Sequence, residues 1–173
     1  MYKVLKIEKY YDETFFTLKN LETGTEIRCF EMDSYDELKE FHFIQESGMY
    51  ECLIKIDVDI KANKESESDK YYKILELNTK IGDYKFAKLE LNKDVYYVLM
   101  DYLKEIQNLE NKEKILLRRI DYHLLKVDDV VSETFKRDEE YEKELPKLLA
   151  KAIEQDNKEA IKLCNLALRN LKG

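Results

Sequence analysis

Turn-forming residues and cysteines are scarce in this chain of 173 residues. Four Gly and one Pro leave few loops, so most residues should lie in regular secondary structure. The three cysteines are widely spaced and fit neither a disulfide framework nor a zinc site. We therefore expect buried free thiols in a cytoplasmic protein. No apolar run approaches the length that spans a bilayer, and the start, MYKVLKIEKYY, is typical of a strand and not of a signal sequence, so no membrane partner is expected.

Motifs that carry catalysis are missing as well. There is no Gly-rich phosphate loop and no nucleophile motif, and His42 and His123 stand alone. Asp57 and Asp59 should share one strand face, which raises the hypothesis of a metal-dependent hydrolase. No companion acids are identifiable in the sequence, and a polar outer face explains the two aspartates more simply. The prediction is a protein that is not an enzyme and uses no cofactor or metal.

The composition is that of a folded, acidic protein. Hydrophobic residues make up 44% of the chain, and 13 Tyr and 7 Phe supply bulky apolar surface for one core. The net charge is −7, and it is concentrated in residues 1–91, which hold 14 Lys/Arg and 20 Asp/Glu, a balance of −6. An acidic domain repels phosphate chains at long range, which disfavours nucleic acid as a partner.

Residues 1–91 alternate between apolar and polar, as strands with one buried face do. Ser34 and Glu37 form a capping box that predicts a short helix at Tyr35–Phe41. Residues 61–70 have no apolar period and predict a loop. The predicted strands are Tyr2–Tyr10, Thr14–Lys19, Glu26–Glu31, Glu51–Ile60, Tyr71–Leu77 and Tyr84–Leu91.

After Asn92 the spacing of apolar residues becomes helical. A heptad seam runs over residues 95–127, interrupted by Glu113 and His123, and predicts one long helix through which a homodimer could form. Asp128 to Glu144 predicts a further helix, and a helical hairpin of residues 148–155 and 158–171 should follow. The expected fold class is α+β: a β-domain over residues 1–91 and an α-helical region over residues 92–173.

The strand order and the hairpin FFTLKNLETGTEIRCF, residues 15–30, resemble the OB-fold domain of nucleic-acid-binding proteins. The resemblance implies an OB-like antiparallel β-barrel over residues 1–91, with ligands lying across its second and third strands. Such barrels bind protein or sugar as well as nucleic acid. At the other end, residues 149–171 are similar to a short IDEAL-type helical segment.

The outer face of that hairpin is the first candidate binding surface. If residues 16, 18, 27 and 29 point inward, then Phe15, Lys19, Arg28 and Phe30 point outward. Two rings and two cations suit single-stranded nucleic acid, because the rings stack bases and the cations meet phosphates. The alternative, which the many apolar helical residues favour, is that a C-terminal helix covers both rings.

A second candidate surface is the lysine-rich stretch of residues 70–93. Lys73, Lys85 and Lys88 alternate there with aromatic residues, as in a nucleic-acid track, or they discourage strands from pairing edge to edge. Because the first 91 residues are acidic and hold a single arginine, Arg28, a protein partner is the favoured prediction. The sequence therefore predicts a non-catalytic protein-interaction module, and the alternative is a single-stranded DNA- or RNA-binding protein.

Overall fold

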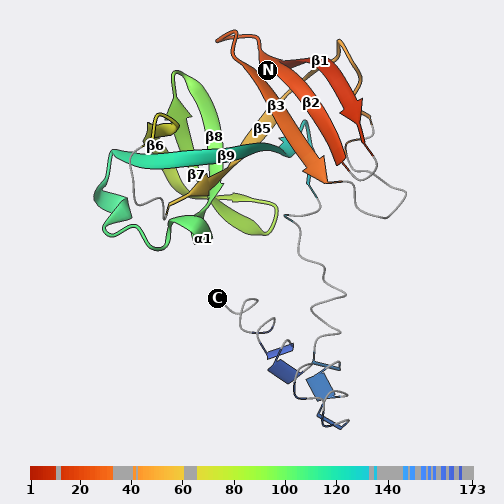
Figure 1. Ribbon diagram of the computed structural model, residues 1–173, viewed down its shortest axis with the longest axis vertical. Helices are drawn as coiled ribbons and strands as arrows, with labels where there is room; N and C mark the ends of the chain where they lie inside the picture. The colour runs from red at the N-terminus through yellow and green to blue at the C-terminus, as the bar shows by residue number, and fades with distance from the viewer. Residues whose placement is uncertain are drawn as a thin grey trace. The chain divides into compact units, whose positions relative to one another are not determined.

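The computed structural model describes residues 1–10, 13–32, 41, 43–60, 66–132 and 135, and scattered positions between 146 and 168. The chain divides into two compact units, Met1–Lys136 and Arg137–Gly173. All the strands belong to the first unit (Figure 1). The elements are β1 (Tyr2–Lys9), β2 (Glu13–Asn20), β3 (Glu26–Met32), β4 (Met49–Tyr50), β5 (Cys52–Asp59), β6 (Asp69–Ile81), β7 (Tyr84–Leu91), β8 (Asp94–Leu99), α1 (Met100–Leu103), the 3₁₀ turn η1 (Leu109–Asn111), β9 (Lys114–Val127) and β10 (Val130–Val131).

The ten strands form one mixed sheet, in which nine follow the order β4-β1-β2-β3-β9-β5-β8-β7-β6 and β10 pairs with β9. The pairings β3–β9 and β5–β8 are parallel, and the other pairings are antiparallel. Strand β9 also pairs with β6 and β10, so it touches four strands. Figure 1 shows β9 crossing from the group β6–β8 towards the group β1–β3. It is the element that joins the two groups of strands.

The strands predicted before residue 92 are confirmed, but the predicted fold class is wrong. The structure is one mixed sheet, not an OB-like barrel of residues 1–91 followed by helices, and the sheet is completed by β8, β9 and β10. The only α-helix among the described elements is α1, of four residues, and neither a long heptad helix nor a helical hairpin occurs there. Of the expected helix at 35–41 only Phe41 is described, in a turn, and large parts of the segments at 128–144, 148–155 and 158–171 lie outside the described residues. The scattered described positions between 146 and 168 are mostly helical.

The heptad interpretation failed because residues 114–127 form a strand, β9, whose buried positions are not those of the seam. Ile115 and Leu117 are buried, with 3% and 1% of their surface exposed, whereas the seam residues Leu116 and Ile120 are 38% and 56% exposed. Pairing with strands on both sides satisfies the backbone of β9 and outweighs its weak local helix propensity. The long helix at residues 95–127, through which a homodimer was predicted, is therefore not formed.

Two-residue turns connect several strands. Asn92 and Lys93 join β7 to β8 and both have positive φ, 53° and 71°, as a type I′ turn requires. Gly82 with Asp83 joins β6 to β7 at a φ of 60° for the glycine. The sequence analysis missed the Asn92 turn, because it placed the start of a helical region there.

One buried carboxylate ties the β2–β3 turn to the start of β8. Asp94 is 3% exposed, and its Oδ1 accepts hydrogen bonds from Asn20 Nδ2 at 2.8 Å and Thr23 Oγ1 at 2.6 Å. Its Oδ2 accepts a hydrogen bond from Thr25 Oγ1 at 2.6 Å. A buried charge needs such donors. The turn is therefore part of the rigid structure and not a free loop.

The main core is continuous across both groups of strands. It joins Phe16, Leu18 and Cys29 of β2 and β3 to Ile54 and Ile56 of β5 and further side chains of β7, β8 and β9. A second, smaller core lies around Phe135, whose ring meets that of Phe86 at 5.5 Å. In the described part of the chain, no helix is long and apolar enough to cross a membrane.

Candidate functional site

The hairpin of β2 and β3 presents the side chains that the sequence placed on its outer face. Phe15 lies opposite Phe30, and Thr17 lies opposite Arg28. The four inward positions, Phe16, Leu18, Ile27 and Cys29, are all buried, so the alternation was predicted correctly. Phe15, Lys19 and Phe30 are half-buried, and Arg28 is exposed.

Four rings form a row across β2, β3 and β9. Tyr10 meets Phe15 edge-on with ring centroids 5.8 Å apart, and Phe15 lies 5.4 Å from Phe30. Phe30 in turn lies 5.3 Å from the ring of His123. The parallel register of β3 and β9, which sets Phe30 beside His123, produces the last contact. We call Tyr10, Phe15, Phe30, His123 and Arg28 the aromatic row.

The cations of this face already have acidic partners. Arg28 places its guanidinium 3.7 Å from the centroid of the Phe15 ring and donates from Nε to Glu8 at 3.3 Å. Lys6 also bonds Glu8, at 3.0 Å, and with Arg28 it lowers the pKa of that carboxyl. Lys19 pairs with Glu26 at 3.4 Å. The surface therefore has cations, but their charges are compensated.

At one end of the aromatic row, His123 contacts Asp57 and, through it, Lys55. His123 Nε2 lies 2.7 Å from Asp57 Oδ2, and the Lys55 ammonium bonds the other oxygen of the same carboxylate. Lys55 is only 6% exposed, because Phe135 lies above its ammonium at 5.3 Å. Burial acts to raise the pKa of Asp57, but the bonds from His123 and Lys55 outweigh it and lower that pKa to about 2. Asp57 is therefore a carboxylate held between the Lys55 ammonium and the His123 imidazole.

This arrangement gives no support to the metal hypothesis. Each oxygen of Asp57 already accepts a bond from a side-chain nitrogen, and the Lys55 ammonium beside it would repel a metal cation. Asp59 lies opposite Arg118. Within residues 1–10, 13–32, 43–60 and 66–132, no group of three or more His, Cys, Asp or Glu side chains is arranged to hold a metal ion.

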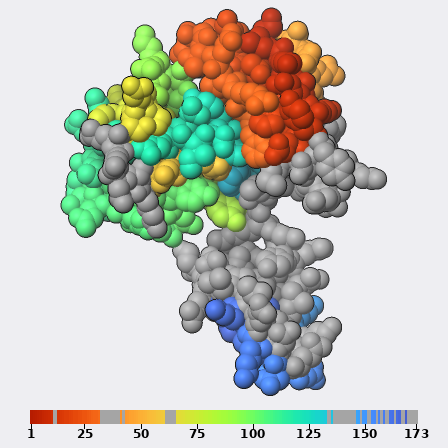
Figure 2. All heavy atoms as spheres, viewed as in Figure 1, coloured from red at the N-terminus to blue at the C-terminus, as the bar shows by residue number. Residues whose placement is uncertain are grey.

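The structure separates the second predicted surface from the first. Lys73 lies on β6 opposite Lys114 of β9, nine residues before His123, or roughly 30 Å along an extended strand. Lys85 lies opposite Lys80, and Lys88 lies opposite Tyr97. The predicted binding residues therefore do not form a single track. Figure 2 shows β9 (teal) reaching the surface between the hairpin (orange) and the start of β6 (yellow).

Sequence reasoning missed the members of the site that come from β5 and β9. His123 was interpreted as an interruption of the heptad seam of a helix, and Lys55 was not singled out. Lys55 and Asp57 are two residues apart on β5, so they lie on one face of the strand, where their side chains bond each other. Their meeting with His123 depends on the register between β5 and β9, for which the sequence has no local signal.

We compared the chain with models of known protein families, with curated proteins and with solved structures, and none of the three comparisons found a match.

Proposed function

We propose that this chain is a non-catalytic protein-binding module whose contact surface is the aromatic row on β2, β3 and β9. The observation that carries the proposal is the arrangement of Arg28, Phe15 and Phe30. A guanidinium packed on half-buried rings, beside the exposed Tyr10, is the kind of residue set that supplies most of the binding energy in protein interfaces. Aromatic residues and arginine are enriched at such interfaces.

The same contacts argue against single-stranded nucleic acid. Base stacking needs a free ring face, and one face of Phe15 is occupied by Arg28 at 3.7 Å. Phosphate binding needs uncompensated cations, whereas Arg28 is bonded to Glu8 and Lys19 to Glu26. A net charge of −7 adds long-range repulsion.

Photo-crosslinking in cells tests the proposal with a matched control in the same chain. Tyr10 and Tyr102 are both exposed, 55% and 47%, and only Tyr10 belongs to the aromatic row. A photo-reactive phenylalanine analogue at position 10 should crosslink to a protein, and the same analogue at position 102 should not. Adding Arg28→Glu should remove the adduct. Equal adducts at both positions, or an adduct that survives Arg28→Glu, would contradict the proposal.

A purified partner then permits a quantitative test. Arg28→Glu or Phe30→Ala should weaken its binding by about 2 kcal/mol, roughly thirty-fold, if these residues are anchors of the interface. Thermal unfolding of each variant checks that the fold is kept. Single-stranded DNA and RNA, titrated at low and moderate salt, form the second arm. Oligonucleotide binding that falls steeply with salt and is lost in Arg28→Glu would favour the nucleic-acid alternative.

A further inference from the structure

Strands β6 and β9 form a second exposed face, away from the aromatic row. Their register sets Tyr71 opposite Leu116 and Lys73 opposite Lys114. Residues opposite each other in an antiparallel pair point to the same side of the sheet, so these four side chains share one face. Tyr72, between Tyr71 and Lys73, is only 2% exposed, so that face points away from the core. We call Tyr71, Lys73, Lys114 and Leu116 the β6–β9 face (Figure 2, where the start of β6 is yellow and β9 is teal).

The surroundings of this face are basic, although the chain as a whole is acidic. Residues 69–73 and 112–119 hold six Lys/Arg and two Asp/Glu, a balance of +4 in a chain of net charge −7. Among the described residues, neither Lys73 nor Lys114 has an ion-pair or hydrogen-bond partner, although Glu90 of β7 lies opposite Lys73. Like charges opposite each other destabilise a sheet, and a bound anion would remove that cost. The Debye length is about 8 Å at physiological ionic strength, so acids elsewhere in the chain repel such an anion only weakly.

Tyr71 adds a free aromatic ring beside this charge. It is 64% exposed, and among the described residues its ring meets no other ring and no cation. On the aromatic row, in contrast, Arg28 covers one face of Phe15 at 3.7 Å and is itself paired with Glu8. A stacked base needs a free ring face, and a phosphate needs an uncompensated cation. The β6–β9 face meets both requirements, whereas Phe15 and Arg28 meet neither.

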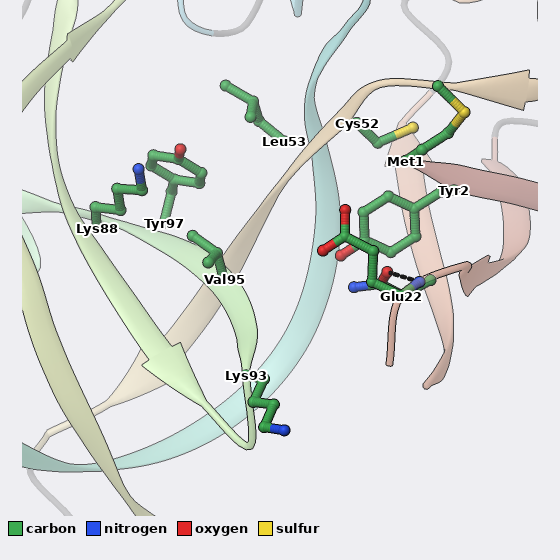
Figure 3. A pocket seen from close by; sticks show the side chains of 10 residues that line it. Met1, Tyr2, Glu22, Cys52, Leu53, Lys88, Lys93, Val95 and Tyr97 are labelled. Atoms are coloured by element: carbon green, nitrogen blue, oxygen red, sulfur yellow. Dashed lines mark hydrogen bonds between the residues drawn. The ribbon is translucent and has the colours of Figure 1, made fainter. Parts of the chain in front are cut away.

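The cavity between the β7–β8 hairpin and β1 gathers no comparable charge. Its volume is about 220 Å³, and its lining includes Lys88 and Lys93. Figure 3 shows these two side chains pointing away from each other, with Val95 and Tyr97 between them, so their charges do not act on one anion. The β6–β9 face differs because the register places its two lysines directly opposite each other.

We propose that the β6–β9 face binds single-stranded nucleic acid, with a base stacked on Tyr71 and the neighbouring phosphates at Lys73 and Lys114. The lysine pair lies two residues from Tyr71 and Leu116 along the strands, roughly 7 Å, which one nucleotide spans between its base and its phosphate. The lysines would also attract an acidic peptide, but acidic side chains offer no flat ring to Tyr71, whereas every base does. Leu116 is roughly 23 Å from His123 along β9, so the proposal holds or fails separately from protein binding at the aromatic row.

Fluorescence anisotropy of the whole chain with labelled oligo-dT and oligo-rU of about 15 nucleotides tests the proposal. One or both probes should bind at low salt. The logarithm of the binding constant should fall with that of the salt concentration with a slope of about −1.4, as two phosphate contacts imply. Binding should persist in Arg28→Glu, which separates this face from the hairpin of β2 and β3. Absence of binding at low salt overturns the proposal, and so does a labelled oligo-glutamate that binds as tightly as the oligonucleotides.

Tyrosine variants test the stacking. Tyr71→Ala should weaken oligonucleotide binding about tenfold, because the base loses its ring, and Tyr71→Phe should not weaken it. Tyr102 is also exposed, 47%, but lies on α1, so Tyr102→Ala is the matched control and should bind as the original chain does. Equal binding by Tyr71→Ala and Tyr102→Ala would overturn the proposal.

Lysine variants test the phosphate contacts. The double variant of Lys73→Gln with Lys114→Gln should lose the oligonucleotide. Lys80 and Lys85 also lie opposite each other and are exposed, at the other end of β6, so the double variant of Lys80→Gln with Lys85→Gln is the matched control. All four lysines are exposed, so both double variants should fold, and thermal unfolding checks this. Equal losses of binding in the two double variants, or none in either, would overturn the proposal.

Discussion

Replacing Asp94 by alanine should be one of the most damaging single changes in this protein. The buried carboxylate accepts three side-chain hydrogen bonds, from Asn20, Thr23 and Thr25. A hydrogen bond to a charged group contributes about 1.5–3 kcal/mol. The three bonds share one carboxylate, so their contributions are not additive, and the freed threonine hydroxyls are only part-buried and regain water. We therefore expect Asp94→Ala to lower the free energy of unfolding by roughly 3–4 kcal/mol, a large part of the ~5–15 kcal/mol that holds a typical domain together.

Urea unfolding followed by circular dichroism measures this loss. The midpoint should fall while the dependence on urea stays constant, because the amount of surface exposed on unfolding does not change. Asp101→Ala is the matched control, since Asp101 is an exposed aspartate whose ion-pair partner among the described residues is the exposed Lys104, and it should leave the midpoint unchanged. Thr25→Val removes one of the three bonds and should have a smaller effect. A loss below ~1 kcal/mol in Asp94→Ala, or an equal loss in Thr25→Val, would refute the idea that the carboxylate holds the turn.

Three further predictions follow from other contacts. Gly82→Ala should destabilise the chain by about 2–4 kcal/mol in urea unfolding, because a Cβ would lie 2.3 Å from the Phe135 carbonyl oxygen. Gly24 has a similar positive φ but open space around it, so Gly24→Ala should cost only about 1 kcal/mol, and equal losses in the two variants would exclude the clash. The pKa of Asp57 is lowered to about 2, so its contribution to stability is complete above the ordinary pKa of 3.8 and is lost as the pH falls from there towards 2. The free energy of unfolding, measured at several pH values, should show this loss in the original chain and depend less on pH in Asp57→Asn. Burial raises the pKa of the Cys29 thiol, so a thiol reagent should modify Cys29 only after unfolding, and rapid labelling of the native chain at Cys29, located by mass spectrometry, would contradict its burial.

The strands of the first 91 residues could be predicted because their signal is local. Alternation in residues 14–31 assigned Phe16, Leu18 and Cys29 to the core and Phe15 and Phe30 to the outer face, and the structure agrees. Each strand buries one face, which leaves a period of two in the sequence.

The later strands could not be predicted in this way. In β8 the run Val95-Tyr96-Tyr97-Val98 meets apolar neighbours on both faces, so it has no alternation to detect. In β9 two register shifts against β5 break the alternation, and the resulting spacing imitates a heptad. Sequence reasoning therefore preferred a helix where pairing between distant segments makes a strand.

The candidate site was predictable to the same extent. The rings and the arginine on β2 and β3 were identified from one hairpin. His123 lies beside Phe30 although the two are 93 positions apart in the sequence, and this contact exists only once β3 and β9 have paired. Contacts of this kind depend on register and topology, which a single sequence does not encode in a local pattern.

The position of β9 in the sheet has a consequence for how the protein is made. Strands β3, β5 and β6 all pair with β9, yet they are synthesised tens of residues before it. During translation their backbone edges stay open until Val127 has left the ribosome, and pairing across such long separations is intrinsically slow. We expect the nascent chain to need protection from aggregation in that interval, and a ribosome stalled before Lys114 should carry an unfolded, protease-sensitive chain.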